Sequence, residues 1–257
     1  MKLSNEIIIK DIDIGNKHFG RICPIGDIHI DAPTWDEEFF DEIMKWIYQN
    51  KDIQVIGMGD YLDLATLKSP TNVHEQKGNT NHQIKTLLRY FAPLAKENRL
   101  VGMLLGNHEY RLNRYAGLDI VELVCDILQV PYMGLGEFIQ FNIKKNNHRE
   151  KYIFYASHGS SGAYTKGGKI NSMYRAAIPF GAEVYLFGHT HDLSTNKENR
   201  YIIENGKRKL IEMHIVNTGH FLKYWGSYAQ MKGYSVGNPG APKIKLHATK
   251  HRVSVHI

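Results

Sequence analysis

The sequence predicts an α/β fold in which buried strands form the core and helices cover them. Short apolar runs rich in β-branched residues alternate with amphipathic stretches over most of the chain, which is the pattern of a sheet layered with helices. The last third of the chain adds strand-like runs on either side of Asn205-Gly206, a pair typical of a tight hairpin turn. A β-rich C-terminal region is therefore expected beside the alternating one.

Five apolar runs predict buried strands, and four amphipathic stretches predict helices. The strands are expected at 21–26, 53–59, 99–106, 151–159 and 182–191. The helices are expected at 35–50, 82–98, 118–128 and 169–180, and Pro93 is expected to kink or restart the second of them. Polar residues 144–151 predict a hairpin loop, residues 200–217 a hairpin, and the Gly-, Tyr- and Pro-rich residues 224–242 an irregular loop.

Length and composition indicate an ordinary soluble protein, expected to form a single domain over residues 1–257. The chain is 42% hydrophobic and 23% charged, and no apolar stretch is long enough to span a membrane. The first residues hold only a short apolar run before acidic residues, so we expect no signal peptide and a cytoplasmic location. Two cysteines, Cys23 and Cys125, are too few for a disulfide framework and are expected to be buried thiols.

The charge balance is modestly basic. Lysine and arginine exceed aspartate and glutamate by six. This excess suits a polyanionic partner such as nucleic acid, although many enzymes of small molecules share it.

Each of the five predicted strands is followed by side chains that commonly bind metal ions. The five segments read GDIH, GMGD, GNHE, SHG and GHTH, and their candidate ligands are Asp27, His29, Asp60, Asn107, His158, His189 and His191. Because strands of an α/β sheet deliver their carboxyl ends to one crevice, residues far apart in sequence are expected to meet there. In four of these segments a glycine (26, 59, 106 or 188) immediately precedes a candidate ligand, and it is expected to let the backbone turn sharply and approach a bound ligand closely.

The mixture of carboxylate, imidazole and amide ligands indicates the kind of metal. It suits divalent Mn, Fe, Zn, Ni or Co, with Mn²⁺ favoured and Mg²⁺ a further option, and it differs from a thiolate zinc site. Seven ligands are more than one catalytic ion needs, and Asp60 could bridge two. A pair of ions about 4 Å apart is a standard device for hydrolysing phosphate esters.

The ordered motifs D-x-H, G-D, G-N-H-E, H and G-H-x-H resemble those of the calcineurin-like metallophosphoesterases, and all five are present between residues 26 and 191. The resemblance implies a four-layer double β-sandwich flanked by helices, which amends the simpler expectation of one parallel sheet. It also implies that one metal is held by Asp27, His29, Asp60 and His191, and the other by Asp60, Asn107, His158 and His189. The later segment NTGH (217–220) departs from the family pattern and receives no role.

The same resemblance gives His108 the role of the catalytic histidine, which stabilises the transition state or protonates the leaving oxygen. Glu109 is expected either to orient His108 or to be structural. Asp63 either buttresses a ligand histidine or caps a helix. Further candidates are Arg111 and Arg114 for substrate phosphate, the lysines of 165–169 for a phosphate path, His220 as a possible functional histidine, and Tyr61, Tyr110 and Tyr164 for stacking on bases.

The predicted function is hydrolysis of phosphate esters by a binuclear metal centre. The basic balance and the SbcD-type nuclease members of the family favour a phosphodiesterase that acts on nucleic acid. The alternatives are a phosphomonoesterase or small-nucleotide hydrolase, and a catalytically silent binding module. A silent module would lack some ligands, and none is missing from this sequence.

Overall fold

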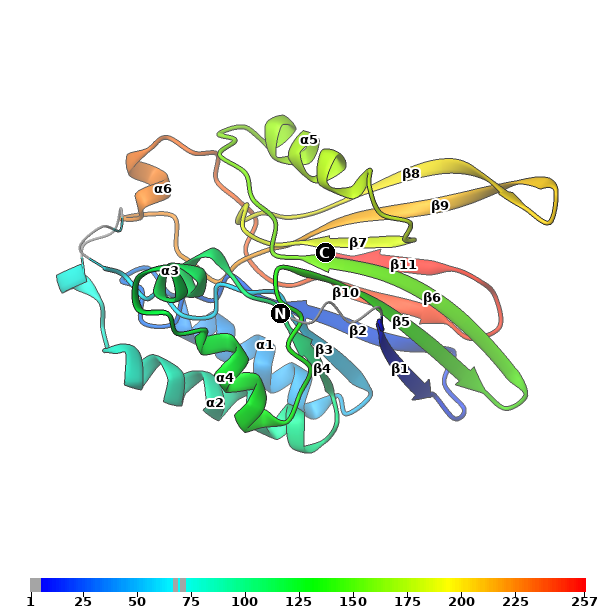
Figure 1. The fold of residues 1–257 in the computed structure, drawn as a ribbon, viewed down its shortest axis with the longest axis horizontal. Helices are drawn as coiled ribbons and strands as arrows, with labels where there is room; N and C mark the ends of the chain where they lie inside the picture. Colours follow the sequence, from blue (N-terminus) through cyan, green and yellow to red (C-terminus); the bar gives the residue numbers. More distant parts are fainter. Residues whose placement is uncertain (1–5, 67–68, 70–72) are drawn as a thin grey trace.

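A computed structural model describes residues 6–66, 69 and 73–257, and two β-sheets lie at its centre (Figure 1). The larger sheet has six strands in the order β1-β5-β6-β7-β9-β8, and the smaller has five in the order β11-β10-β2-β3-β4. The strands of the larger sheet are β1 Ile8–Asp13, β5 Gly136–Lys145, β6 His148–Ser157, β7 Val184–Phe187, β8 Leu193–Glu204 and β9 Lys207–Thr218. Those of the smaller sheet are β2 Phe19–Ile25, β3 Ile53–Gly57, β4 Leu100–Met103, β10 Lys243–His247 and β11 Val253–His256.

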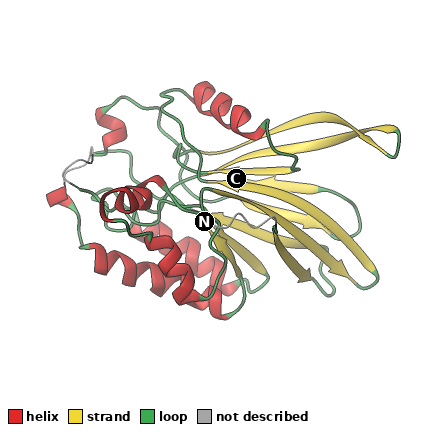
Figure 2. Ribbon diagram, viewed as in Figure 1, coloured by secondary structure: helices red, strands yellow, loops and turns green. Residues whose placement is uncertain are grey.

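The helices are α1 Glu37–Gln49, α2 Thr80–Lys96, α3 Asn107–Ala116, α4 Ile120–Leu128, α5 Lys166–Ala177 and α6 Tyr228–Met231, with a short 3₁₀ helix η1 at Val73–Glu75. Helices α1, α2, α4 and α5 lie on the outer faces of the two sheets, while α3 and α6 lie beyond the ends of the strands (Figure 1 and Figure 2). α1, α2 and α4 share a buried apolar cluster with the smaller sheet. α5 packs Met173 and Ala177 against Tyr185 and Phe187 of β7.

A second apolar cluster fills the space between the sheets. Ile22 and Ile56 of the smaller sheet share it with Phe141 and Phe154 of the larger one, and all four are fully or almost fully buried. The order of layers is therefore helices, sheet, sheet and helix, which confirms the predicted four-layer sandwich. Both sheets mix parallel and antiparallel pairs, so a single parallel sheet would have been the wrong description.

Most predicted elements are present, and their ends are set by local capping. Asp36 accepts a hydrogen bond from the backbone N–H of Phe39 at the start of α1, and Asp119 caps α4 through two N–H groups. α2 runs through Pro93 to Lys96 without ending there. Three described helices were not predicted. α3 begins at Asn107, inside the GNHE segment, where only the end of a strand was expected, and the short helices η1 and α6 were not expected either.

Two predicted hairpins are confirmed. Asn205 and Gly206, with φ of 51° and 73°, form the turn between β8 and β9, as an Asn-Gly pair favours. This hairpin is longer than predicted and extends beyond the sheets (Figure 1). The other hairpin joins β5 to β6 within residues 144–151.

Both cysteines are buried free thiols, as predicted. Burial raises the pKa of Cys23 and of Cys125 to about 12, which leaves little reactive thiolate at neutral pH. None of the helices in the described part of the chain is both long enough and apolar enough to cross a membrane.

Candidate metal centre

The structure brings all seven predicted ligands to one place, beyond the carboxyl ends of strands from both sheets. Asp27 and His29 follow β2, Asp60 follows β3, and Asn107 opens α3 just after β4. His158 follows β6, while His189 and His191 follow β7. The site therefore lies where the two layers of the sandwich deliver their strand ends.

One group of four side chains is close enough to share a cation. Single ligand atoms of Asp27, His29, Asp60 and His191 all lie within 4.8 Å of one another. His29 Nε2 is 3.1 Å from His191 Nε2, which in turn is 3.1 Å from Asp27 Oδ1. This is the first of the two ligand sets that the motifs implied.

A second group adjoins the first and uses Asp60 again. Atoms of Asp60, His158 and His189 also lie within 4.8 Å of one another. The Asn107 amide oxygen lies 2.7 Å from His189 Nδ1 and 3.0 Å from His158 Nε2. These four residues are the second implied set, and Asp60 is common to both.

The hydrogen bonds around His158 indicate that a positive charge would stabilise this second set of ligands. Its Nδ1–H donates to the Met58 carbonyl, 2.8 Å away, which leaves Nε2 facing Asn107 Oδ1 and Asp60 Oδ2 at 3.0 and 3.3 Å. A lone pair facing two acceptors is unfavourable unless a proton or a metal ion lies between them. Burial lowers the pKa of His158, but the charge and hydrogen bond of Asp60, the charge of Asp27 and the hydrogen bond to Met58 together raise it to about 10. The donor set therefore fits a divalent cation.

The ligands adopt a backbone conformation that side chains other than glycine seldom take. Asp27, His29, Asp60, His189 and His191 all have φ between 48° and 66°, in the left-handed region. Strain of this kind clusters at functional sites, where the surrounding structure maintains it. The sharp turns at these five positions are thus made by the ligands themselves.

Of the neighbouring glycines, Gly59 makes a sharp turn with φ of 88°, as expected, whereas Gly106 and Gly188 allow a close approach. A Cβ at Gly106 would lie 2.0 Å from the backbone nitrogen of Asp60, and one at Gly188 would lie 2.7 Å from Asp27 Oδ2. Gly106 itself has φ of −88°, so the expectation that it provides a sharp turn is wrong. Its lack of a side chain makes room for Asp60.

Glu109 holds the turn at Asp60. Its carboxylate is fully buried and accepts hydrogen bonds from the N–H groups of Asp60, at 3.1 Å, and Leu62, at 2.9 Å. Burial, followed by the negative charge of Asp60, raises the pKa of Glu109 to about 8. Of the two roles left open for Glu109, the structural one agrees with these contacts.

His108 lies at the edge of the metal centre and lines the cavity in front of it. Its ring Nδ1–H donates a hydrogen bond to the backbone carbonyl of Asp63 at 2.6 Å, and its backbone N–H donates to Asp60 Oδ1 at 2.8 Å. Its Nε2 is 4.0 Å from Asp60 Oδ2. Asp63 caps no described helix and lies against His108, so it buttresses the histidine predicted to be catalytic.

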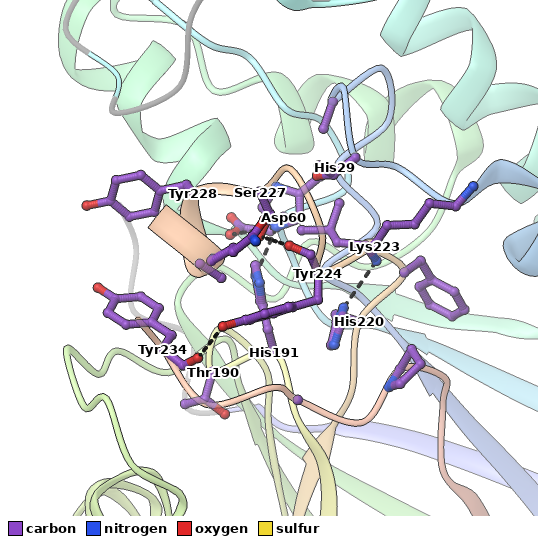
Figure 3. Close-up of a pocket in the computed structure, with 18 of the residues that line it drawn as sticks. His29, Asp60, Thr190, His191, His220, Lys223, Tyr224, Ser227, Tyr228 and Tyr234 are labelled. Carbon is purple, nitrogen blue, oxygen red and sulfur yellow. Dashed lines mark hydrogen bonds and ion pairs between the residues drawn. The ribbon is translucent and has the colours of Figure 1, made fainter. Parts of the chain in front are cut away.

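The cavity has a volume of about 1280 Å³ and extends from the ligands to residues 222–237 and Pro239 (Figure 3). Arg111 lines it and donates to Ser69 Oγ at 2.6 Å, whereas Arg114 is exposed and not among the lining residues. Of the lysines in 165–169, buried Lys169 lines the cavity. His220 lines it as well, with its ring 5.4 Å from that of His191.

One contribution to the site was not predicted. Residues 222–231 and 234–237 supply much of the cavity wall, although the Tyr, Gly and Pro content of an irregular loop was the only signal in the sequence. Tyr61, a candidate for stacking, is instead fully buried, and its hydroxyl donates to the Leu104 carbonyl.

The chain belongs to the calcineurin-like phosphoesterases, because the model of that family matches residues 20–193. Together with the clustered Asp and His ligands, this membership defines a metal-dependent phosphoester hydrolase. A comparison with curated proteins gave no match.

Similar solved structures include a Vps29 single mutant from Entamoeba histolytica, with 16% identity, coverage of 91% of this chain and 89% of that chain, and a TM-score of 0.41. A predicted phosphoesterase from Streptococcus pneumoniae has 14% identity, coverage of 93% and 90%, and a TM-score of 0.39. Vps29 from Cryptosporidium parvum has 15% identity, coverage of 93% and 97%, and a TM-score of 0.38.

Glu109→Ala is expected to lower the free energy of unfolding by about 2 kcal/mol or more, because it leaves two buried N–H groups without an acceptor. Urea unfolding in the presence of EDTA measures this loss without a contribution from bound metal. Glu198→Ala, at an exposed position on β8, is the matched control. Equal stabilities of the two variants would contradict the role given to Glu109.

Proposed function

We propose that this chain is a phosphodiesterase that uses two divalent metal ions and acts on nucleic acid. The observation that carries the proposal is the pair of ligand groups that share Asp60 beside His108, at one end of a large cavity. A shared carboxylate can hold two cations at the short separation, about 4 Å, that two-metal hydrolysis uses.

Asp27, His29, Asp60 and His191 would hold one ion, and Asp60, Asn107, His158 and His189 the other. When bound, the ions would lower the pKa of a water molecule and offset charge on the phosphoryl oxygens. Mn²⁺ is the favoured ion, and the ligand types also accept Fe, Zn, Ni, Co or Mg.

His108 is placed to contact the substrate. The Asp63 carbonyl can only accept a hydrogen bond, so it fixes the proton of His108 on Nδ1 and fixes the plane of the ring. Nε2 is then free to carry the second proton of the imidazolium form, which would donate to a phosphoryl oxygen or protonate the leaving oxygen. Arg111, held by Ser69 on the cavity wall, is placed for a second contact with the phosphate.

The size and charge of the cavity support a diester substrate. At about 1280 Å³ it exceeds the ~300–1,000 Å³ of most small-molecule sites, so it has room for groups on both sides of a phosphate. Arg111, Lys169 and Lys223 are among its lining residues. The excess of six basic residues in the chain also suits a polyanion.

A second candidate is a phosphomonoesterase or small-nucleotide hydrolase. It is favoured by residues 222–237, which form one wall of the cavity and so limit the length of substrate that can enter. The diester is preferred because a simple monoester would leave most of the cavity empty.

Variants are expected to separate the roles of His108 and Asp60. His108→Ala should lower kcat by about 10²-fold or more while the metal content remains near that of the wild type, because His108 is not a proposed ligand. Asp60→Ala should remove both ions. Metal analysis of the purified proteins, with exposed His256→Ala as a control, checks both expectations. Loss of metal from the His108 variant would refute this division of roles.

The choice between diester and monoester is tested with two chromogenic substrates. In the presence of Mn²⁺, kcat/KM for bis-p-nitrophenyl phosphate should exceed that for p-nitrophenyl phosphate, and labelled DNA should be cleaved. Hydrolysis of the monoester alone would exclude the phosphodiesterase and favour the second candidate.

A further inference from the structure

Three tyrosines form a wall of the cavity across from the metal centre. Tyr224, Tyr228 and Tyr234, here called the aromatic wall, are half-buried and line the same cavity as His29, Asp60 and His191. Figure 3 shows the rings of Tyr228 and Tyr234 side by side, with the hydroxyl of Tyr224 reaching the backbone of Tyr234. Substrate held at the metal centre would therefore lie in front of aromatic rings.

The rings pack edge to face, so each such contact covers one face of one ring, and Lys232 Nζ lies over the Tyr228 ring, 5.7 Å from its centroid. The Tyr228 and Tyr234 centroids are 6.2 Å apart with planes at 89°, and Tyr164 meets Tyr234 at 4.7 Å and 82°. A flat ring that joins such a cluster can stack on a free face, which is the geometry aromatic groups prefer. The aromatic wall thus offers a surface for a planar group.

Hydrogen bonds hold the aromatic wall in place before any ligand binds. The Tyr224 hydroxyl donates to the Tyr234 carbonyl at 3.0 Å, and the Ser227 hydroxyl donates to the Tyr224 carbonyl at 2.6 Å. The same Ser227 oxygen accepts from the N–H of Gln230 at the start of α6. A surface fixed in this way loses little entropy when it binds a rigid ring.

Two polar side chains that line the cavity are placed to contact a ligand. The hydroxyl of Ser235, next to Tyr234, is buried and has no hydrogen-bond partner among the described residues. Lys169 on α5 is only 5% exposed and lines the cavity, where the charge of Asp192 acts on its ammonium. A planar ligand with polar edges and a neighbouring negative charge would satisfy both.

We propose that the aromatic wall binds a nucleobase attached to the scissile phosphodiester, and that the substrate is single-stranded nucleic acid. The base would stack on Tyr228 and Tyr234 with an edge toward Ser235, while Lys169 contacts a neighbouring phosphate. Stacking on aromatic side chains tolerates any base, because every base has a π-face. Bases within a duplex are stacked and paired, so their faces cannot reach such a wall.

This inference rests on the proposed phosphodiesterase function, and two diesters with one leaving group test it. Thymidine 5′-(p-nitrophenyl phosphate) carries a base, whereas methyl p-nitrophenyl phosphate does not. The wild-type kcat/KM should be about tenfold or more higher for the thymidine diester, as expected for one stacked base. Hydrolysis of p-nitrophenyl phosphate but of neither diester would refute the phosphodiesterase itself. Equal kcat/KM values would refute only the nucleobase site.

Paired variants show whether the aromatic faces cause the preference. Replacing both tyrosines as Tyr228→Leu and Tyr234→Leu should abolish the ratio between the two diesters. Tyr228→Phe with Tyr234→Phe should retain it, because the rings remain. Tyr201→Ala, at an exposed site on β8 outside the cavity, is the control. A ratio that survives the leucine pair would overturn the proposal.

A labelled oligonucleotide tests the choice of strand. Alone, it should be cleaved faster than when it is annealed to its complement, and the leucine pair should reduce this difference. Equal cleavage of the two forms by the wild-type protein would refute the single-stranded substrate.

Discussion

The turn at Asp60 is the constraint on which the metal centre depends. The backbone carbonyl of Asp60 accepts hydrogen bonds from the backbone N–H groups of Ile28 and His29, at 2.9 and 3.1 Å, and so holds the GDIH segment in place. Its Oδ1 accepts from the N–H of His108 at 2.8 Å, and its own N–H donates to Glu109. One residue therefore ties three strand ends together, and any displacement of Asp60 would move ligands of both groups.

The rest of the fold keeps this strained arrangement in place. Five ligands have left-handed backbone, and the acceptors and imidazoles of the site converge at hydrogen-bond distance. These features cost free energy, and the apolar layers on both sides of the sheets offset it. A cation that binds only the folded state would add stability by mass action. The ligand groups are thus arranged to hold a positive charge that a bound cation would supply.

The sequence was sufficient for the fold class and for the ligands' convergence, because strand ends and metal ligands leave strong local patterns. The sequence was insufficient to predict those features of the site that depend on contacts between residues far apart in the chain. The two hydrogen bonds of Glu109 to the Asp60 turn join residues that are 49 and 47 positions apart, and no periodicity in the sequence indicates them. The start of α3 was missed because GNHE follows an apolar run directly. The wall formed by residues 222–237 has no regular pattern, so only the folded chain shows that it faces the metal centre.

The aromatic wall and the metal centre lie at two sides of one cavity, which links the chemistry of phosphate cleavage to the choice of substrate. That link holds only if Asp60 bridges two cation sites. Anomalous diffraction from crystals grown with Mn²⁺ measures this directly. Two peaks are expected, each in contact with a carboxylate oxygen of Asp60 and with one of the two ligand groups. A single peak, or two peaks of which one does not contact Asp60, would contradict the bridging role of Asp60.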